Sequence, residues 1–164
     1  MSDVGVRWDE SQMRRLYANV CNVTSSREEV VLLFGTSQAP VGGEAELAVQ
    51  LTDRVEKLRY IGVNTPEIHH PSKGEEPGGR EAAEVNRGLV GGRRVRLELD
   101  VQTRDRYGRL LAYVWVGDTM INAELVRLGY AQVMTVPPNV RYQDLFVKLQ
   151  RQARDAHRGL WRPV

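Results

Sequence analysis

The chain has 164 residues, which suits one compact domain and leaves too little sequence for a second full domain. Its hydrophobic share of 41% and its charged share of 27% exclude a largely disordered protein, and no apolar run approaches the ~20 residues of a membrane-spanning helix. A formal net charge of +2 is too small to indicate a nucleic-acid partner by itself, so the positions of the charges matter more than their sum.

The N-terminal segment, residues 1–15, is rich in charged side chains and lacks the apolar stretch of a secretory signal. The single cysteine, Cys21, excludes an internal disulfide and suits a reducing compartment. Together these two features predict a cytoplasmic protein.

The first part of the chain is predicted to consist of strands and loops. Short apolar or alternating runs bounded by turn formers indicate strands at residues 17–23, 28–34, 45–51 and 57–63. A long polar loop with several glycines and prolines follows at residues 69–79. A loop of that length is more often functional than structural when it lies beside a candidate site.

Helices and strands alternate in the rest of the chain. Helices are predicted at residues 80–90, 122–128 and 140–157, and strands at 93–100, 110–116 and 131–136. Asn122 is expected to cap the second helix, and Leu145, Leu149 and Ala153 are expected to form the apolar side of the third. This order predicts an α+β fold that is mainly β, namely a small barrel decorated with helices.

A charged turn at the end of the fourth predicted strand is the first candidate site. Arg59 lies on this strand and Glu67 follows it closely, while residues 104–109 form an arginine cluster before the next apolar run. Guanidinium groups match phosphate oxygens and a carboxylate can take a proton from water, so this set suits a phosphodiester substrate. For Arg109, an ion pair with Asp105 within the hairpin remains the alternative interpretation.

From about residue 57 to residue 161 the sequence resembles the staphylococcal nuclease (thermonuclease) family. The matching stretches, in chain order, are Arg59-x-x-Gly62-Val63-x-Thr65-Pro66-Glu67, His70-Pro71, Lys73-Gly74, Tyr107-Gly108-Arg109-x-Leu111-Ala112-Tyr113-Val114, Met120-Ile121-Asn122-x-Glu124-Leu125-Val126-Arg127-x-Gly129 and Leu160-Trp161. The ordered series makes the resemblance specific, because any one of these stretches alone is common.

The resemblance implies an OB-fold, a five-stranded β-barrel with three helices, and a Ca²⁺-dependent phosphodiesterase that cleaves DNA and RNA to 3′-phosphate products. The partner we expect is single-stranded DNA or RNA. In this family pattern, Glu67 would be the general base on the attacking water, and Arg59 and Arg109 would bind the phosphate and stabilise its developing charge. The residues expected to contact the substrate are Tyr107, Lys73 and Arg106.

The metal site departs from the family pattern. No Asp-Gly-Asp occurs in the chain, and Asn64 stands where the family has its other metal-binding aspartate. Glu44 and Glu46 lie at roughly the distance before Arg59 where the missing aspartate would be, so the candidate metal ligands are Asn64, Thr65, Glu44 and Glu46. Calcium affinity depends strongly on the number of charged ligands. The alternative function is therefore an OB-fold nucleic-acid or protein-binding module that has lost its metal site.

Two other regions also differ from the family. Residues 134–136 read Met-Thr-Val where the family often has tyrosines over the bound base. Residues 1–55 match the family poorly and resemble instead a small uncharacterised bacterial family. We expect one domain over residues 1–164, in which atypical strands from residues 1–55 complete the barrel of a nuclease-like core at residues 56–164.

Overall fold

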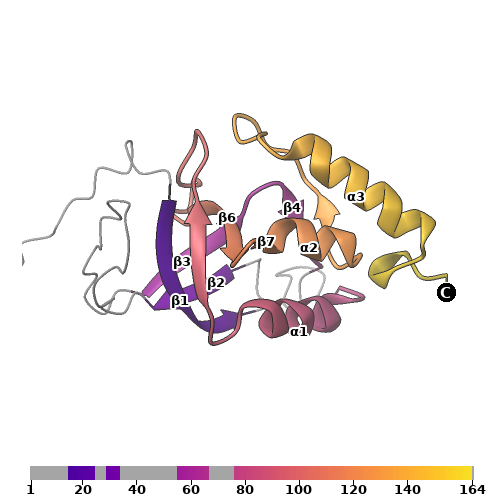
Figure 1. Ribbon diagram of the computed structural model, residues 1–164, viewed down its shortest axis with the longest axis horizontal. Coiled ribbons are helices and arrows are strands. Elements are labelled where there is room, and N and C mark those ends of the chain that lie inside the picture. Colours follow the sequence, from indigo (N-terminus) through magenta and orange to yellow (C-terminus); the bar gives the residue numbers. More distant parts are fainter. Residues whose placement is uncertain (1–14, 25–28, 34–54, 67–75, 164) are drawn as a thin grey trace, which may run out of the picture.

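The computed structural model describes residues 15–24, 29–33, 55–66 and 76–163, and only the backbone before residue 57 (Figure 1). Within these ranges the main sheet has six strands, in the order β3-β2-β1-β5-β6-β7. The strands are β1 (Arg15–Thr24), β2 (Glu29–Leu33), β3 (Val55–Tyr60), β5 (Arg94–Glu98), β6 (Leu110–Val116) and β7 (Thr119–Met120). A second sheet pairs β4 (Val63–Asn64) with β8 (Gln132–Val133).

The two N-terminal strands belong to the same sheet as the rest of the chain. β1 pairs antiparallel with β2 and with β5, and β2 pairs antiparallel with β3. β3 in turn pairs in parallel with β6. The strands predicted at residues 17–23 and 28–34 are therefore confirmed, whereas the one predicted at 45–51 lies outside the described residues. The division of the chain at residue 55 stays a prediction.

Three α-helices lie on one side of the main sheet in the part of the chain that is described (Figure 1). They are α1 (Gly79–Val90), α2 (Ile121–Arg127) and α3 (Gln143–Asp155), and the 3-10 helix η2 (Gly159–Trp161) follows them. These helices and the sheet confirm the predicted α+β class. None of the helices described is long and apolar enough to cross a membrane.

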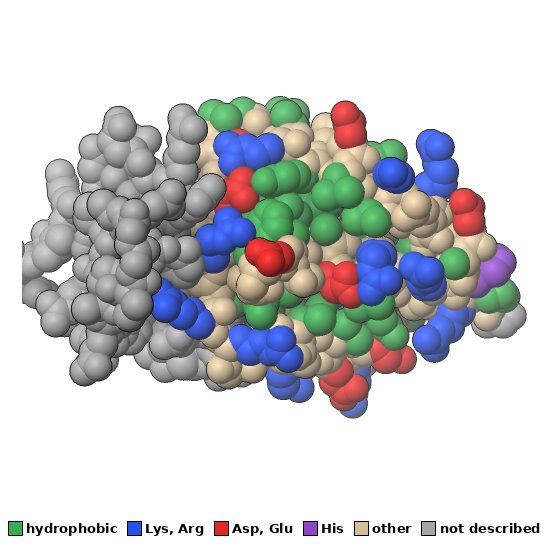
Figure 2. Space-filling view, viewed as in Figure 1, with side chains coloured by type: hydrophobic (Ala, Val, Ile, Leu, Met, Phe, Trp, Pro, Cys, Tyr) green, Lys and Arg blue, Asp and Glu red, His purple; other side chains and the backbone are tan. Residues whose placement is uncertain are grey.

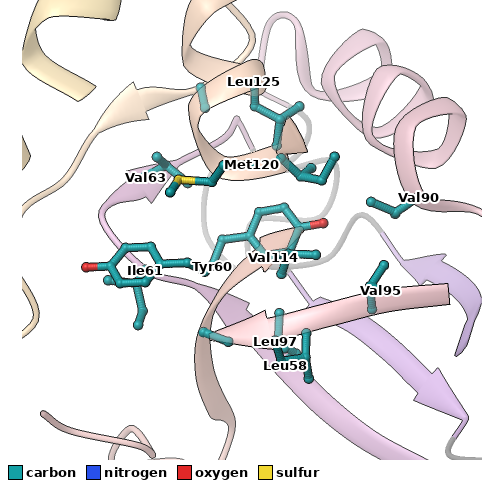
Figure 3. Packing of buried hydrophobic residues seen from close by; sticks show 14 of the residues in the cluster. Leu58, Tyr60, Ile61, Val63, Val90, Val95, Leu97, Val114, Met120 and Leu125 are labelled. Carbon is teal, nitrogen blue, oxygen red and sulfur yellow. The ribbon is translucent and has the colours of Figure 1, made fainter. Parts of the chain in front are cut away.

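Apolar side chains from the sheet and the helices form one core. Leu58 of β3, Leu97 of β5, Val114 of β6 and Leu125 of α2 are at most 2% exposed, and Figure 3 shows how these elements converge. The prediction for the apolar side of α3 is confirmed for Ala153 and Leu149, which pack inward, and is wrong for Leu145. Leu145 is 40% exposed, whereas its neighbour Phe146 is 1% exposed and packs near Tyr113, with ring centroids 6.2 Å apart.

Asn122 does not cap α2, contrary to the prediction. Met120 precedes the helix and Asn122 lies inside its first turn, fully buried. Its side chain accepts a hydrogen bond from the backbone N–H of Val114 at 2.9 Å and donates one to the carbonyl of Ile61 at 2.9 Å. The amide therefore satisfies buried backbone groups of two other segments, the end of β3 and strand β6.

Gly62 connects β3 to β4 at a point where no other residue fits well. Its φ is +79°, and a Cβ atom there would lie 2.6 Å from Cε2 of Phe146. We expect Gly62→Ala to lower the free energy of unfolding by about 2 kcal/mol, because backbone strain and a clash with a buried ring add together. Chemical denaturation would measure the change.

The matched control is Gly108→Ala. Gly108 has the same φ of +79°, but a Cβ atom there would meet nothing within 4 Å. Its substitution should therefore show the backbone strain alone, about 1 kcal/mol. If both substitutions lowered the free energy of unfolding equally, the Phe146 ring would be able to move away from the new methyl group without destabilising the fold.

Candidate active site

A pocket of about 310 Å³ opens where β3 ends. Four segments form its walls: the β3–β4 connection, the loop at residues 102–107, strand β6 and the segment at residues 134–139. The lining residues are Arg59, Tyr60, Ile61, Gly62, Val63, Gln102, Asp105, Arg106, Tyr107, Leu111, Met134, Val136 and Asn139. The arrangement combines cationic groups and an aromatic ring at the pocket with an apolar interior.

Arg59 is brought to this pocket by the pairing of β3 with β6. It lies in parallel register with Leu111, which lines the same pocket. The Arg59 side chain is half-buried, and its Nη2 donates to Sδ of Met134 at 3.8 Å. A thioether is a weak acceptor, so a phosphate oxygen at this place would be a much stronger partner for the guanidinium.

Arg109 is held in the hairpin before β6 by Asp105. Its Nε donates to Oδ2 of Asp105 at 2.6 Å, and the two side chains are only 7% and 11% exposed. Oδ1 of Asp105 accepts the backbone N–H groups of Tyr107 at 2.8 Å and of Arg109 at 3.0 Å. The ion pair that was the alternative interpretation of Arg109 is therefore confirmed, while a role in phosphate binding stays a prediction.

The Asp105 carboxylate is ionised more readily than an ordinary aspartate. Burial raises its pKa, but the hydrogen bonds from the side chain and backbone of Arg109 and from the backbone of Tyr107 together outweigh burial and leave the pKa below its usual value. A lowered pKa in the folded state stabilises the fold above the unfolded-state pKa, and this contribution is lost as the pH falls through the folded-state value.

We therefore expect the difference in unfolding free energy between the wild type and Asp105→Asn to shrink as the pH falls below about 4, where aspartate in an unfolded chain becomes protonated. Urea denaturation of both proteins at neutral and acidic pH measures this difference. Glu124 also has a lowered pKa, caused first by its hydrogen bond from Arg127, but it is present in both proteins and cancels. A constant difference across the range would contradict the assignment.

Tyr107 and Arg106 are two exposed residues of the pocket lining. The Tyr107 side chain is 59% exposed, and its hydroxyl oxygen accepts a hydrogen bond from Nη2 of Arg106 at 2.6 Å. Cζ of Arg106 lies 4.7 Å from the centre of the Tyr107 ring, and Cζ of Arg109 lies 5.4 Å from it. The ring is thus flanked by two guanidinium groups, a setting suited to a planar base attached to a phosphate.

The described candidate metal ligands do not make a calcium site by themselves. Asn64 pairs with Gln132 in the small sheet and Thr65 follows it; both are half-buried and offer neutral oxygen atoms. In the ranges described, no group of three or more His, Cys, Asp or Glu side chains could hold a metal ion. This donor set does not fit calcium, which needs several oxygens, some of them charged. The predicted site residues outside the described ranges are Glu44, Glu46, Glu67 and Lys73.

Sequence patterns did not indicate two polar residues of the pocket, Gln102 and Asn139. Asn139 is 5% exposed, accepts the backbone N–H of Gln102 at 2.8 Å, and donates to the Gln102 carbonyl at 2.7 Å. It therefore fixes the loop that carries Asp105 and Tyr107. No local pattern predicts this contact between Asn139 and Gln102. The only local signal is that Asn139 follows two prolines, which is typical of a turn.

The face of the described residues that Figure 2 draws shows no single basic field. On the face drawn in Figure 2, Lys and Arg side chains are spread out with Asp and Glu between them. Binding of an anionic polymer would therefore depend on local groups at the pocket rather than on a uniform charge.

Comparison with protein-family models divides the chain near the start of β3. Residues 57–163 match the model described as Staphylococcal nuclease homologue. Residues 1–57 match a second model, described as Protein of unknown function (DUF3467). The first match confirms the principal resemblance found in the sequence, and the second is also to a family without an assigned function.

Known proteins similar to this chain include several that are nucleases by name. The thermonuclease of Staphylococcus intermedius is 36% identical over 138 residues, which cover 78% of this chain and 82% of that protein. The thermonuclease of Staphylococcus hyicus is 38% identical over 115 residues, covering 70% of this chain and 68% of that protein. Endonuclease YncB of Bacillus subtilis is 32% identical over 138 residues, covering 83% of this chain and 65% of that protein.

Proposed function

Because the chain belongs to the staphylococcal nuclease family, we infer that it is a nuclease, and we propose that it hydrolyses phosphodiester bonds of DNA or RNA at the pocket beside Arg59. The observation that carries this proposal is the grouping of Arg59, Asp105 and Tyr107 around one pocket, with Arg109 bonded to Asp105 just behind the lining. Membership of the family supports a nuclease function, and the role of each single residue is our proposal.

In the proposed reaction, water attacks the phosphorus and the bond from phosphorus to the 5′-oxygen breaks. The departing 5′-oxygen takes up a proton from solvent, which leaves a 3′-phosphate on one fragment and a 5′-hydroxyl on the other. Glu67 takes the proton of the attacking water, and Arg59 and Arg109 donate hydrogen bonds to the phosphate oxygens, whose negative charge grows in the transition state. No step is assigned to calcium, because the described donors do not fit it. The calcium requirement that the family resemblance implies needs an experiment.

We further propose that the substrate strand is unpaired. The apolar pocket walls include Leu111, Met134 and Val136; Val136 is 53% exposed, and Tyr107 of the same lining is 59% exposed. Bases in a duplex are stacked on each other and cannot reach such a surface, whereas an unpaired base can enter the pocket and stack on an aromatic ring. A preference for denatured over duplex DNA is therefore expected.

The second candidate function is a nucleic-acid or protein-binding module without catalysis. It is favoured by the composition of the described metal-ligand candidates, Asn64 and Thr65, which carry no charge. Such a module would keep Arg59 and Arg109 as anchors for phosphate but would lack strong metal binding.

The two functions are separated by a digestion assay on denatured DNA at increasing calcium concentration, with a chelator in a parallel series. Cleavage that depends on calcium supports the nuclease and its metal requirement, and cleavage that persists in chelator supports a nuclease without it. Absence of cleavage at every calcium concentration, together with DNA binding that weakens as salt rises, would establish the binding module instead.

A further inference from the structure

The pairing of β2 with β3 brings one acidic residue to the position opposite Arg59. β2 begins at Glu29, and the Cα partner of Glu29 in the antiparallel register is Arg59. Residues directly opposite each other in an antiparallel pair lie on the same face of the sheet, with Cβ atoms about 4.5–5.5 Å apart. A carboxylate-bearing residue and the arginine of the pocket thus occupy adjoining positions.

The composition of β2 makes this position distinctive. The strand reads Glu-Val-Val-Leu-Leu, so Glu29 is its single charged residue. The register places Val31 opposite Lys57 and Leu32 opposite Glu56, the other charged residues of β3 that pair with β2. The one charged residue of β2 therefore lies opposite the one arginine of β3 in the register. Opposite charges in such a cross-strand pair attract each other.

Glu29 also lies outside the part of the chain that the nuclease family model covers. The nuclease model begins at residue 57, and Glu29 lies in the stretch that matches the family of unknown function. The N-terminal strands therefore do more than extend the sheet, because they place an ionisable residue beside a residue of the proposed active site.

We propose that Glu29 is a positioning residue for Arg59, a proposal that rests on the nuclease function proposed above. In the other half of the site, the Asp105 carboxylate orients the Arg109 guanidinium through a bond of 2.6 Å. By the same reasoning, a carboxylate at the register position opposite Arg59 restricts the guanidinium to fewer orientations, so less of its freedom is lost when it binds a phosphate.

The first test reads the Arg59 guanidinium directly and needs no activity. Arginine side-chain NMR of the full chain, with the Arg59 Nε–H signal identified by Arg59→Lys, is compared between the wild type and Glu29→Gln. The matched control is Glu56→Gln, which removes an equal charge from β3 at a position opposite Leu32. The signal should shift in Glu29→Gln and stay in place in Glu56→Gln. An Arg59 signal unchanged in Glu29→Gln would overturn the proposal.

The second test separates positioning from stability. Glu29→Gln should lower kcat about fivefold to tenfold with little change in KM, and Glu29→Asp should restore part of the loss. In an Arg59→Lys background the same substitution should have no further effect, because the residue that it positions is already altered. Equal losses in both backgrounds would show a role independent of Arg59 and would contradict the proposal.

The same variants distinguish this proposal from two other outcomes. If Glu29→Gln weakens calcium binding in calorimetry and leaves the Arg59 signal unchanged, the carboxylate is a metal ligand and the positioning role is wrong. If the wild type shows no cleavage, the nuclease function fails, while the NMR comparison still decides whether Glu29 orients Arg59.

Discussion

Replacing Asn122 by leucine is expected to lower the free energy of unfolding by about 4 kcal/mol. The Asn122 side chain is fully buried and contacts three backbone groups: the N–H of Val114, the carbonyl of Ile61 and, at 3.4 Å, the carbonyl of Ala112. Leucine has a similar volume but cannot bond to any of them, so the buried N–H of Val114 in particular would lose its partner. Denaturant midpoints of the two proteins measure the loss.

The consequence should extend to the pocket. Ile61 donates its N–H to the Ala112 carbonyl at 3.1 Å, so Asn122 reinforces the junction at which β3 joins β6. The same junction sets Arg59 beside Leu111. The variant should therefore bind oligonucleotides more weakly even at temperatures at which it is still folded.

Asn86→Leu is the matched control for this stability measurement. Asn86 is half-buried and accepts one hydrogen bond, from the hydroxyl of Tyr60 at 2.9 Å. The same chemical change should cost about 1 kcal/mol there. If Asn122→Leu were no more damaging than Asn86→Leu, the bonds of Asn122 would contribute nothing beyond an ordinary polar contact.

The fold was predictable where local signals determine the structure. The apolar run from Leu110 to Val116, closed by a glycine turn, is the strand β6 with the predicted bounds. Asn122 shows the limit of such signals, because an asparagine at a helix start indicates a cap, and only the tertiary packing places it under β3 and β6. For α3, Phe146 rather than Leu145 is buried because its ring fits against Gly62. The spacing of apolar residues along the helix does not show this contact.

The candidate site was predictable only in part, for a related reason. The hairpin that carries Asp105 and Arg109 is local, and its ion pair could be anticipated from the sequence. The pocket itself requires β3 to lie beside β6 and Asn139 to hold the loop at Gln102, and both contacts join residues far apart in the chain. The position of Glu29 opposite Arg59 depends on strand register, which composition does not determine.

The second large effect is expected at Arg109. Arg109→Lys should lower kcat/KM by about 10²–10³, the range found when one donor to a developing negative charge is removed. Lysine keeps the charge but lacks the planar fork, so it cannot bind Asp105 through Nε and present other donors to a phosphate. Because the side chain is only 7% exposed, no other orientation is readily available to it. Initial rates on a short single-stranded oligonucleotide provide the measurement.

Two further variants show whether the loss comes from the phosphate contact or from the hairpin. Asp105→Asn keeps Arg109 but weakens its orientation, so its loss should be smaller, about tenfold. Arg104 lies in the same hairpin and donates to the Gly108 carbonyl at 2.9 Å, and Arg104→Lys should stay within about twofold of the wild type because that contact is far less buried. If Arg109→Lys kept most of the activity while lowering the denaturant midpoint, Arg109 would be a structural partner of Asp105, and the proposed contact of Arg109 with the phosphate would be wrong.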